Sequence, residues 1–182
     1  KAEKRGRAHV GRSESRYADL LYDFRASEGL AQYPNANSTM RLTYGNVQPL
    51  NPSDGVHYDS RSTIAGYMEK YNPDEYEFRV DDRMKRLIAA EDWGRWGEKG
   101  TLCVNFLTDN DITGGNSGSP VLDGRGRLIG LAFDGNRESM AGDVWFHPDL
   151  ARTVCVDIRY VMWIIDKYAE ADWLLDEMKF EK

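Results

Sequence analysis

The chain has 182 residues, of which 41% are apolar and 30% charged, and its formal net charge is −6. This length fits one domain, or one domain with an appendage, that can bury a real core. The acidic balance argues against nucleic acid or an anionic membrane as a partner, and no apolar run approaches the roughly 18 residues of a membrane span. Two cysteines are too few for a disulfide scaffold and lack the spacing of a zinc site, so no metal or other cofactor is expected.

Residues 1–32 are expected to form a helical segment. Residues 1–12 are rich in Lys and Arg and are expected to be a solvated or frayed tail, with a basic patch for a partner as the alternative. A helix is predicted to begin at a capping serine, Ser13 or Ser15, and to end at Gly29. Its apolar side consists of Tyr17, Leu20, Leu21 and Phe24.

The pattern then changes to strands. Met40, Leu42 and Tyr44 alternate with Arg41 and Thr43, which predicts a half-buried strand. A loop rich in turn residues follows, and residues 56–67 are expected to be extended but irregular.

The middle of the chain mixes short elements. Residues 77–80 are a strand candidate, and Asp81 is expected to cap a helix that buries Met84, Leu87 and Ile88. Trp93 and Trp96 are expected to cover the core from a surface loop.

The second half is rich in predicted strands. Leu102, Val104 and Phe106 form one face of a strand, and residues 123–126 give a hairpin signal between residues 121–122 and 128–133. Residues 142–146 and 153–156 supply two more extended pieces. Asp157 is then expected to cap a long apolar helix that runs toward the C-terminus.

A glycine-rich loop, Thr113-Gly114-Gly115-Asn116-Ser117-Gly118-Ser119-Pro120-Val121, lies between two of these strands. Glycine permits positive φ and lets backbone N–H groups converge, as an acyl-transfer enzyme needs around a developing oxyanion. Ser117 is the candidate nucleophile, and a β-turn whose serines cap the backbone is the alternative. The run Gly-Asn-Ser-Gly-Ser-Pro resembles the nucleophile loop of chymotrypsin-like serine proteases.

The expected fold is therefore mainly β. Residues 33–182 are expected to form the second six-stranded barrel of a chymotrypsin-like two-barrel protease, closed by a C-terminal helix and preceded by the N-terminal helical segment.

A more specific resemblance rests on five stretches. Residues 110–121, 128–136 and 156–161, together with 33–39 and 41–45, resemble the bacterial dipeptidyl-peptidase 7 and 11 family. The resemblance implies peptide substrates, a periplasmic or cell-surface location and a homodimer. It also implies a preceding N-terminal barrel and an inserted helical domain, so residues 1–32 would be the end of that domain or a linker.

The chain's histidines do not complete a catalytic triad. A serine hydroxyl needs a histidine to take its proton and a carboxylate to orient that histidine. His57 with Asp81 or Asp82 has the right order, but the interval to Ser117 is too short to contain most of a barrel, and the neighbours of His57 are not the Gly/Ala-rich setting of a catalytic base. His147 follows the serine and is expected to be a loop residue, and none of His9, His57 and His147 is expected to be the base. The resemblance places the histidine and aspartate in the N-terminal barrel, so this chain alone is expected to be inactive.

The residues around Ser117 have further expected roles. The backbone N–H groups of Gly115 and Ser117 would form the oxyanion hole. Trypsin-type proteases usually carry Asp in place of Asn116, and that Asp pairs with a newly cleaved N-terminus. Asn cannot form this charge pair, so activation of that kind is not expected.

Three positions bear on substrate choice. Asp111 lies six residues before Ser117, where trypsin-like enzymes recognise Arg or Lys, with a turn cap as the alternative. The resemblance implies that Asp134 binds the substrate's free α-ammonium, with a plain turn as the alternative. It also implies that Gly135 leaves an uncharged pocket for an apolar residue before the scissile bond, with Arg137 at its rim where many relatives carry an aromatic residue.

Two alternatives to a dipeptidyl peptidase stay open at this point, namely an endopeptidase of trypsin or glutamyl type and a non-catalytic binding module derived from a protease. For Cys103 and Cys155, a cross-strand disulfide and two buried free thiols are both open.

Overall fold

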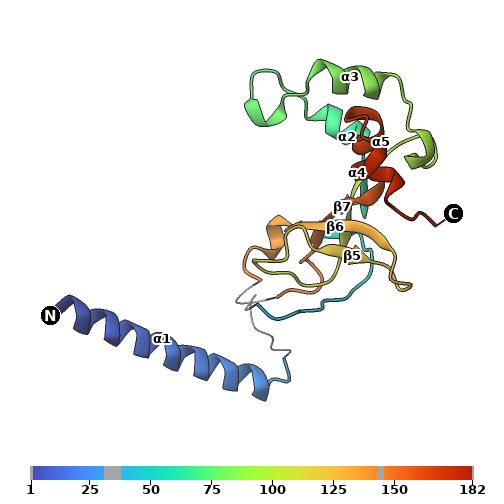
Figure 1. The fold of residues 1–182 in the computed structure, drawn as a ribbon. Helices are drawn as coiled ribbons and strands as arrows, with labels where there is room; N and C mark the ends of the chain where they lie inside the picture. Colours follow the sequence, from blue (N-terminus) through green and yellow to red (C-terminus); the bar gives the residue numbers. More distant parts are fainter. Residues whose placement is uncertain (1, 31–37, 143–145, 182) are drawn as a thin grey trace. The chain divides into compact units, whose positions relative to one another are not determined.

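The computed structural model describes residues 2–30, 38–142 and 146–181, with side chains from residue 10 onward. The chain divides into two compact units, Lys1–Ser38 and Thr39–Lys182 (Figure 1). Within the described ranges, no helix is both long and apolar enough to cross a membrane.

The first unit consists of one helix, α1, Ala2–Ser27. It begins earlier than predicted, and Ser15 lies within it and donates to the carbonyl of Gly11 at 3.0 Å instead of capping the helix. The prediction of a frayed start is thus wrong, because Ala, Glu, Lys and Arg are strong helix formers. The predicted end at Gly29 is confirmed: its φ is +67°, and the N–H groups of Gly29 and Leu30 donate to the carbonyls of Ala26 and Arg25 at 3.2 and 2.9 Å, a Schellman motif.

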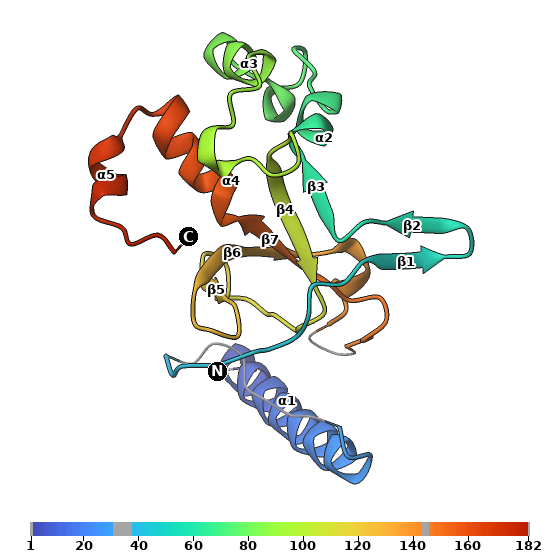
Figure 2. The ribbon, with the colours of Figure 1, turned by 90° about the vertical axis from the view of Figure 1, so that its right-hand side faces the viewer.

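The second unit is built on an antiparallel sheet of five strands (Figure 2). The strands lie in the order β3, β4, β7, β6, β5, with the bounds Arg61–Thr63, Cys103–Thr108, Thr153–Asp157, Leu128–Gly135 and Pro120–Leu122. A separate hairpin joins β1, Leu50–Ser53, to β2, Val56–Tyr58.

This sheet corrects the expected six-stranded barrel. The described strands form an open sheet that ends at β3 and β5, and each of these edge strands has only three residues. Such short edges pair over too little length to close a barrel. The predicted extended piece at residues 142–146 lies mostly outside the described residues.

The strand predicted at residues 40–44 is also absent. Met40, Leu42 and Tyr44 are 96%, 85% and 90% exposed, whereas Arg41 and Thr43 are half-buried. The alternation exists, but its polar side faces the protein. The chain is fixed at Asn46, just after this segment. The N–H of Asn46 donates to Asp109 Oδ1 at 2.6 Å, and the carbonyl of Asn46 accepts from the N–H of Asp109 at 3.0 Å.

Two predicted helix caps are confirmed. The Asp81 carboxylate accepts from the N–H of Met84 at 3.0 Å at the start of α3, Asp82–Ala89, and this hydrogen bond lowers the pKa of Asp81. Asp157 accepts from the N–H of Arg159 at 2.9 Å at the start of α4, Ile158–Trp163. The predicted long helix is divided, since α4 continues as a π-helical turn, Ile164–Tyr168, and is followed by α5, Asp172–Asp176.

The remaining helical elements are short. They are α2, Ile64–Glu69, and three 3₁₀ turns, Tyr76–Phe78, Gly94–Trp96 and Arg137–Ser139. The strand candidate at residues 77–80 is therefore wrong. The carbonyl of Phe78 accepts from the N–H of Asn72 at 3.0 Å, which folds this segment back on itself instead of onto the sheet.

The main core lies where α3 and α4 meet the end of the sheet, and three tryptophans dominate it. Trp93, Trp96 and Trp163 are at most 8% exposed, so the two loop tryptophans belong to the core and do not cover it from the surface. Each indole N–H has an acceptor: the carbonyl of Gly100, the carboxylate of Asp166 and the carbonyl of Asp92, at 3.2, 2.7 and 3.1 Å. These bonds explain how the indoles are buried at little polar cost.

Gly130 in β6 leaves room for the neighbouring strand β7 and for the ring of Phe106, which comes from β4. A Cβ at this position would lie 2.6 Å from the carbonyl oxygen of Val156 and 2.8 Å from Phe106 Cε1. We expect Gly130→Ala to destabilise this unit by about 1–3 kcal/mol, because neither the partner strand nor the ring can move freely. A lower urea midpoint for unfolding of the protein would show this.

Gly66 in α2 is the matched control, since a Cβ there meets no atom within 4 Å. Gly66→Ala should leave the midpoint unchanged or raise it, as alanine is the better helix former. If Gly130→Ala unfolded at the same urea concentration as the parent, the packing of β6 on Phe106 would be contradicted.

Candidate active site

The glycine-rich loop predicted to carry the nucleophile runs along the end of β6. The N–H of Gly118 donates to the carbonyl of Ala132 at 2.7 Å, and the N–H of Ala132 donates to the carbonyl of Ser119 at 2.9 Å. These bonds continue the β5–β6 pairing into the loop. Ser117 is exposed there, and its hydroxyl donates to the carbonyl of Phe133 at 3.2 Å.

The loop leaves two backbone donors unused. Gly115 and Gly118 have φ of +99° and +81°, which only glycine adopts at low cost, and they flank the serine. Among the described residues, the N–H groups of Gly115 and Ser117 donate to no acceptor. Backbone N–H groups without an acceptor are available to bind an oxygen of a ligand.

Asn116 holds the loop together from the position before the serine. Its side-chain oxygen accepts from the N–H of Thr113 at 3.1 Å, and its own N–H donates to the carbonyl of Thr113 at 3.1 Å. A guanidinium N–H of Arg41 also donates to this oxygen at 2.8 Å. The sequence analysis gave Arg41 no role, although Arg41 lies in one of the stretches that carry the family resemblance. The alternation at residues 40–44 was interpreted with the apolar side inward.

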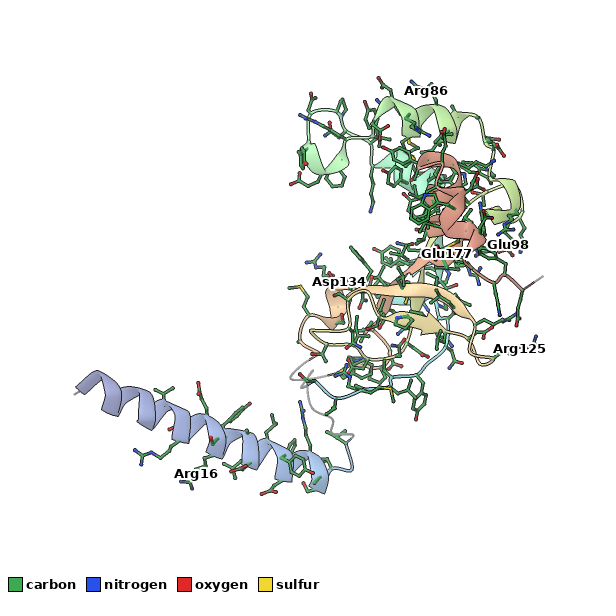
Figure 3. The ribbon with its side chains drawn as sticks, in the orientation of Figure 1. Arg16, Arg86, Glu98, Arg125, Asp134 and Glu177 are labelled. Atoms are coloured by element: carbon green, nitrogen blue, oxygen red, sulfur yellow. The ribbon has the colours of Figure 1, made fainter. Side chains whose placement is uncertain are left out.

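A β-bulge in β6 contains the residue whose carbonyl Ser117 contacts. In the β6–β7 register, Ala132 pairs with Cys155 and Asp134 with Val154, so Phe133 is an extra residue. Phe133 and Asp134 are consequently both exposed, and Phe133 carries the carbonyl that Ser117 contacts. Figure 3 labels Asp134 at this end of β6.

The Asp134 carboxylate has no cationic partner among the described side chains. Its Oδ1 accepts from the N–H of Gly135 at 2.8 Å, which fixes the rotamer and leaves the other oxygen open. An exposed carboxylate held in this way can accept an ammonium group. Asp111, the alternative specificity residue, is half-buried just before the glycine-rich loop.

Gly135 has a packing reason to be glycine. A Cβ there would lie 2.3 Å from the Oγ of Ser139, which donates to the carbonyl of Asn136 at 2.7 Å. Any side chain at this position therefore requires Ser139 to change its rotamer. Arg137 is exposed in the 3₁₀ turn that follows.

No histidine side chain within the described part of the chain contacts Ser117. The ring of His57 lies in the β1–β2 hairpin, between Asn51 Oδ1 at 2.7 Å and Asp59 Oδ1 at 3.2 Å. His147 is exposed in a turn, and the side chain of His9 lies outside the described set. Asp81 serves as a helix cap, so the pairing of His57 with Asp81 is not formed.

Cysteine and metal chemistry are not indicated either. Cys103 and Cys155 are both free, and the β4–β7 register, which pairs Phe106 with Cys155, places their side chains on opposite faces of the sheet. The disulfide alternative is therefore wrong. Burial raises the pKa of Cys103 to about 11 and also raises that of Cys155, so neither is a ready thiolate nucleophile.

Across the described ranges, no group of three or more His, Cys, Asp or Glu is placed to hold a metal ion.

Known proteins resemble this chain over most of its length. It is 55% identical over 146 residues to dipeptidyl-peptidase 7 of Phocaeicola vulgatus, which covers 80% of the chain and 20% of the relative. It is 48% identical over 151 residues to the Asp/Glu-specific dipeptidyl-peptidase of Capnocytophaga gingivalis, which covers 82% and 21%. The chain thus spans about a fifth of the length of these relatives.

Structural comparison agrees with these similarities. The crystal structure of Porphyromonas endodontalis DPP11 in complex with the dipeptide Arg-Glu matches with a TM-score of 0.78 and 43% identity, over 88% of this chain and 23% of that one. The family model described as Peptidase S46 matches residues 1–180. The chain therefore belongs to the Peptidase S46 family.

Proposed function

We propose that this chain supplies the nucleophile and the substrate-binding carboxylate of a serine dipeptidyl peptidase. The observation that carries the proposal is the hydrogen bond from the Ser117 hydroxyl to the carbonyl of Phe133. Further support is that Phe133 directly precedes Asp134 in the chain and that Asp134 is exposed. A nucleophile, an oxyanion site and an anchor for an N-terminal ammonium are together what release of N-terminal dipeptides requires.

The reaction then follows the two steps of acyl-enzyme chemistry. Ser117 Oγ loses its proton to a histidine and attacks the carbonyl carbon of the scissile bond, and the N–H groups of Gly115 and Ser117 stabilise the negative oxygen. The C–N bond breaks, the amine leaves with that proton, and the dipeptide remains esterified to Ser117. Water, deprotonated by the same histidine, hydrolyses the ester and releases the dipeptide.

The histidine and its orienting aspartate come, in this proposal, from a part of the protein outside these 182 residues. The support is that the relatives are about five times as long as the segment they share with this chain and that the described histidine rings do not contact Ser117. A chymotrypsin-like first barrel would supply both residues. An inserted helical domain would end near residue 32, and residues 33–182 would form the second half. The chain by itself would then be inactive.

Asp134 sets the exopeptidase character in this proposal. A carboxylate fully exposed to water gains little from pairing with an ammonium, so the pair needs partial desolvation to discriminate. The bound substrate and the proposed first barrel would provide that shielding. An internal or acetylated peptide lacks the charge and would leave Asp134 unpaired.

The residue preferred before the scissile bond is proposed to be apolar. The relatives bear both names, dipeptidyl-peptidase 7 and Asp/Glu-specific dipeptidyl-peptidase, so their names do not decide between the two preferences. Gly135 provides no positive charge for an acidic side chain, and Ser139 blocks a longer residue at that position without rearrangement. Arg137, in the turn that follows, is a cation that would oppose this preference.

The test is hydrolysis of paired peptide libraries by the whole protein. One library has free N-termini and the other acetylated N-termini, and products are identified by mass spectrometry. We expect dipeptides from the free library, with apolar residues at the second position, and at least a roughly 100-fold lower rate with the acetylated library.

Other outcomes point to the alternatives. Equal cleavage of both libraries would identify an endopeptidase, and an acidic second position would contradict the role given to Gly135. No cleavage of either library would favour a non-catalytic binding module. The periplasmic or cell-surface location and the homodimer stay predictions.

A further inference from the structure

Arg41 reaches the nucleophile loop from a distant part of the chain. Its guanidinium donates to the side-chain oxygen of Asn116 at 2.8 Å across a sequence separation of 75 residues. The contact is half-buried, so water screens it less than it screens a surface contact. Asn116 directly precedes Ser117, and the guanidinium therefore acts one residue from the proposed nucleophile.

Asn116 is the central hydrogen-bonded residue of the loop. Its side-chain oxygen and N–H both bond to the backbone of Thr113, and its carbonyl accepts from the N–H of Ser119 at 2.9 Å. The peptide groups that precede and follow Asn116 carry the carbonyl of Gly115 and the N–H of Ser117. The hydrogen bonds of Asn116 therefore fix the peptide group that carries the N–H of Ser117, one of the two proposed oxyanion donors.

The chain is held against the sheet a few residues after Arg41. Beyond the pair of bonds between Asn46 and Asp109, Val47 forms a β-bridge with Thr108. Gly45 approaches so closely that a Cβ would lie 2.2 Å from Asp109 Oδ1 and 2.7 Å from the N–H nitrogen of Asn110. This close packing fixes the backbone four residues after Arg41.

We propose that Arg41 is a positioning residue that locks the nucleophile loop in its reactive conformation. In trypsin-type proteases, a cation from a newly cut N-terminus reaches the residue before the nucleophile. Here the cation comes from within the chain, so the loop is set without any cleavage. The inference rests on the proposed role of Ser117, and it adds a specific mechanism by which the loop is held.

The test compares variants of the whole protein by kcat per active site, with active sites counted by titration with a phosphonylating reagent. Arg41→Met removes the donor and keeps the aliphatic stem. We expect kcat to fall roughly 10- to 100-fold and KM to change less than about threefold. The reason is that displaced oxyanion donors act mainly on the transition state. Arg41→Lys keeps a charged donor and should recover part of the loss. Arg125→Met, at an exposed turn position, is the matched control and should match the parent.

A double-mutant cycle with Asn116→Ala isolates the contact. If Arg41 acts through Asn116, Arg41→Met should have little further effect on kcat in the Asn116→Ala background. Full additivity would overturn the proposal, as would a parental kcat per site in Arg41→Met. If Arg41→Met did not fold, a parental kcat per site in Asn116→Ala would overturn the proposal, and a reduced one would support it.

The outcomes separate this inference from the function it rests on. An active Ser117→Ala protein would refute the proposed function itself. An inactive Ser117→Ala protein together with a fully active Arg41→Met protein would refute only the role of Arg41.

Discussion

Ser117→Ala in the whole protein should lower kcat by roughly 10⁶, which is the loss that follows removal of the nucleophile from a serine protease. The fold should persist, because the only side-chain hydrogen bond lost among the described residues is that to the carbonyl of Phe133. The backbone bonds of Gly118 and Ser119 to Ala132 do not involve the hydroxyl. Initial rates with a free dipeptide substrate measure the effect.

Ser119→Ala is the control for this prediction. Ser119 lies two residues further along the same loop and bonds through its backbone to Asn116 and Ala132. Its hydroxyl has no role in the proposed reaction, so Ser119→Ala should keep kcat within about threefold of the parent. The reverse result, with Ser119→Ala inactive and Ser117→Ala active, would identify Ser119 as the nucleophile instead of Ser117.

Asp134→Asn should reduce kcat/KM for substrates with a free N-terminus by roughly 10²-fold, since truncating one partner of a desolvated charge pair costs about this much or more. Asparagine retains the oxygen that accepts from the N–H of Gly135, so the end of β6 should keep its shape. The rate with acetylated substrates should stay as low as in the parent. The ratio of free to acetylated rates should therefore collapse toward one.

Asp149→Asn removes an equal charge from an exposed turn and serves as the control. It should leave the ratio of free to acetylated rates unchanged. If Asp134→Asn preserved this ratio as well, the substrate ammonium would have to be recognised by another group, and Asp134 would be a turn residue only.

Local signals predicted the elements that depend on neighbouring residues. The caps at Asp81 and Asp157 and the stop at Gly29 were all correct. The hairpin predicted at residues 123–126 was also correct. The Asp123 carboxylate accepts from the N–H of Arg125 at 2.8 Å. The hydrogen bond between this carboxylate and the Arg127 side chain lowers the pKa of Asp123 to about 2. Each of these features is decided within a few residues, so sequence contains the needed information.

Long-range packing explains the errors. Residues 40–44 present their polar side inward because Arg41 has a partner 75 residues away, which periodicity does not reveal. Trp93 and Trp96 are buried because acceptors on other segments satisfy their indole N–H groups. The open sheet likewise depends on which segments pair, and not on the strand propensity of any one of them.

The candidate site was only partly predictable for the same reason. The glycine-rich loop identifies Ser117 as a possible nucleophile, but its contact with Phe133 depends on the bulge in β6. Gly135 was interpreted through substrate choice alone, whereas Ser139 gives it a separate packing role. Tertiary contacts thus add Arg41 and Ser139 to the residues that the loop sequence suggested.

The central proposal is that Ser117 is the nucleophile, and trapping it covalently is the most direct measurement. The whole protein would be treated with a fluorophosphonate that phosphonylates activated serines, digested, and mapped by mass spectrometry. We expect a single phosphonyl group per chain, located on Ser117, with a rate that a free dipeptide substrate reduces by competition. A modification on another residue, or an unmodified Ser117 in protein that cleaves dipeptides, would contradict the proposal.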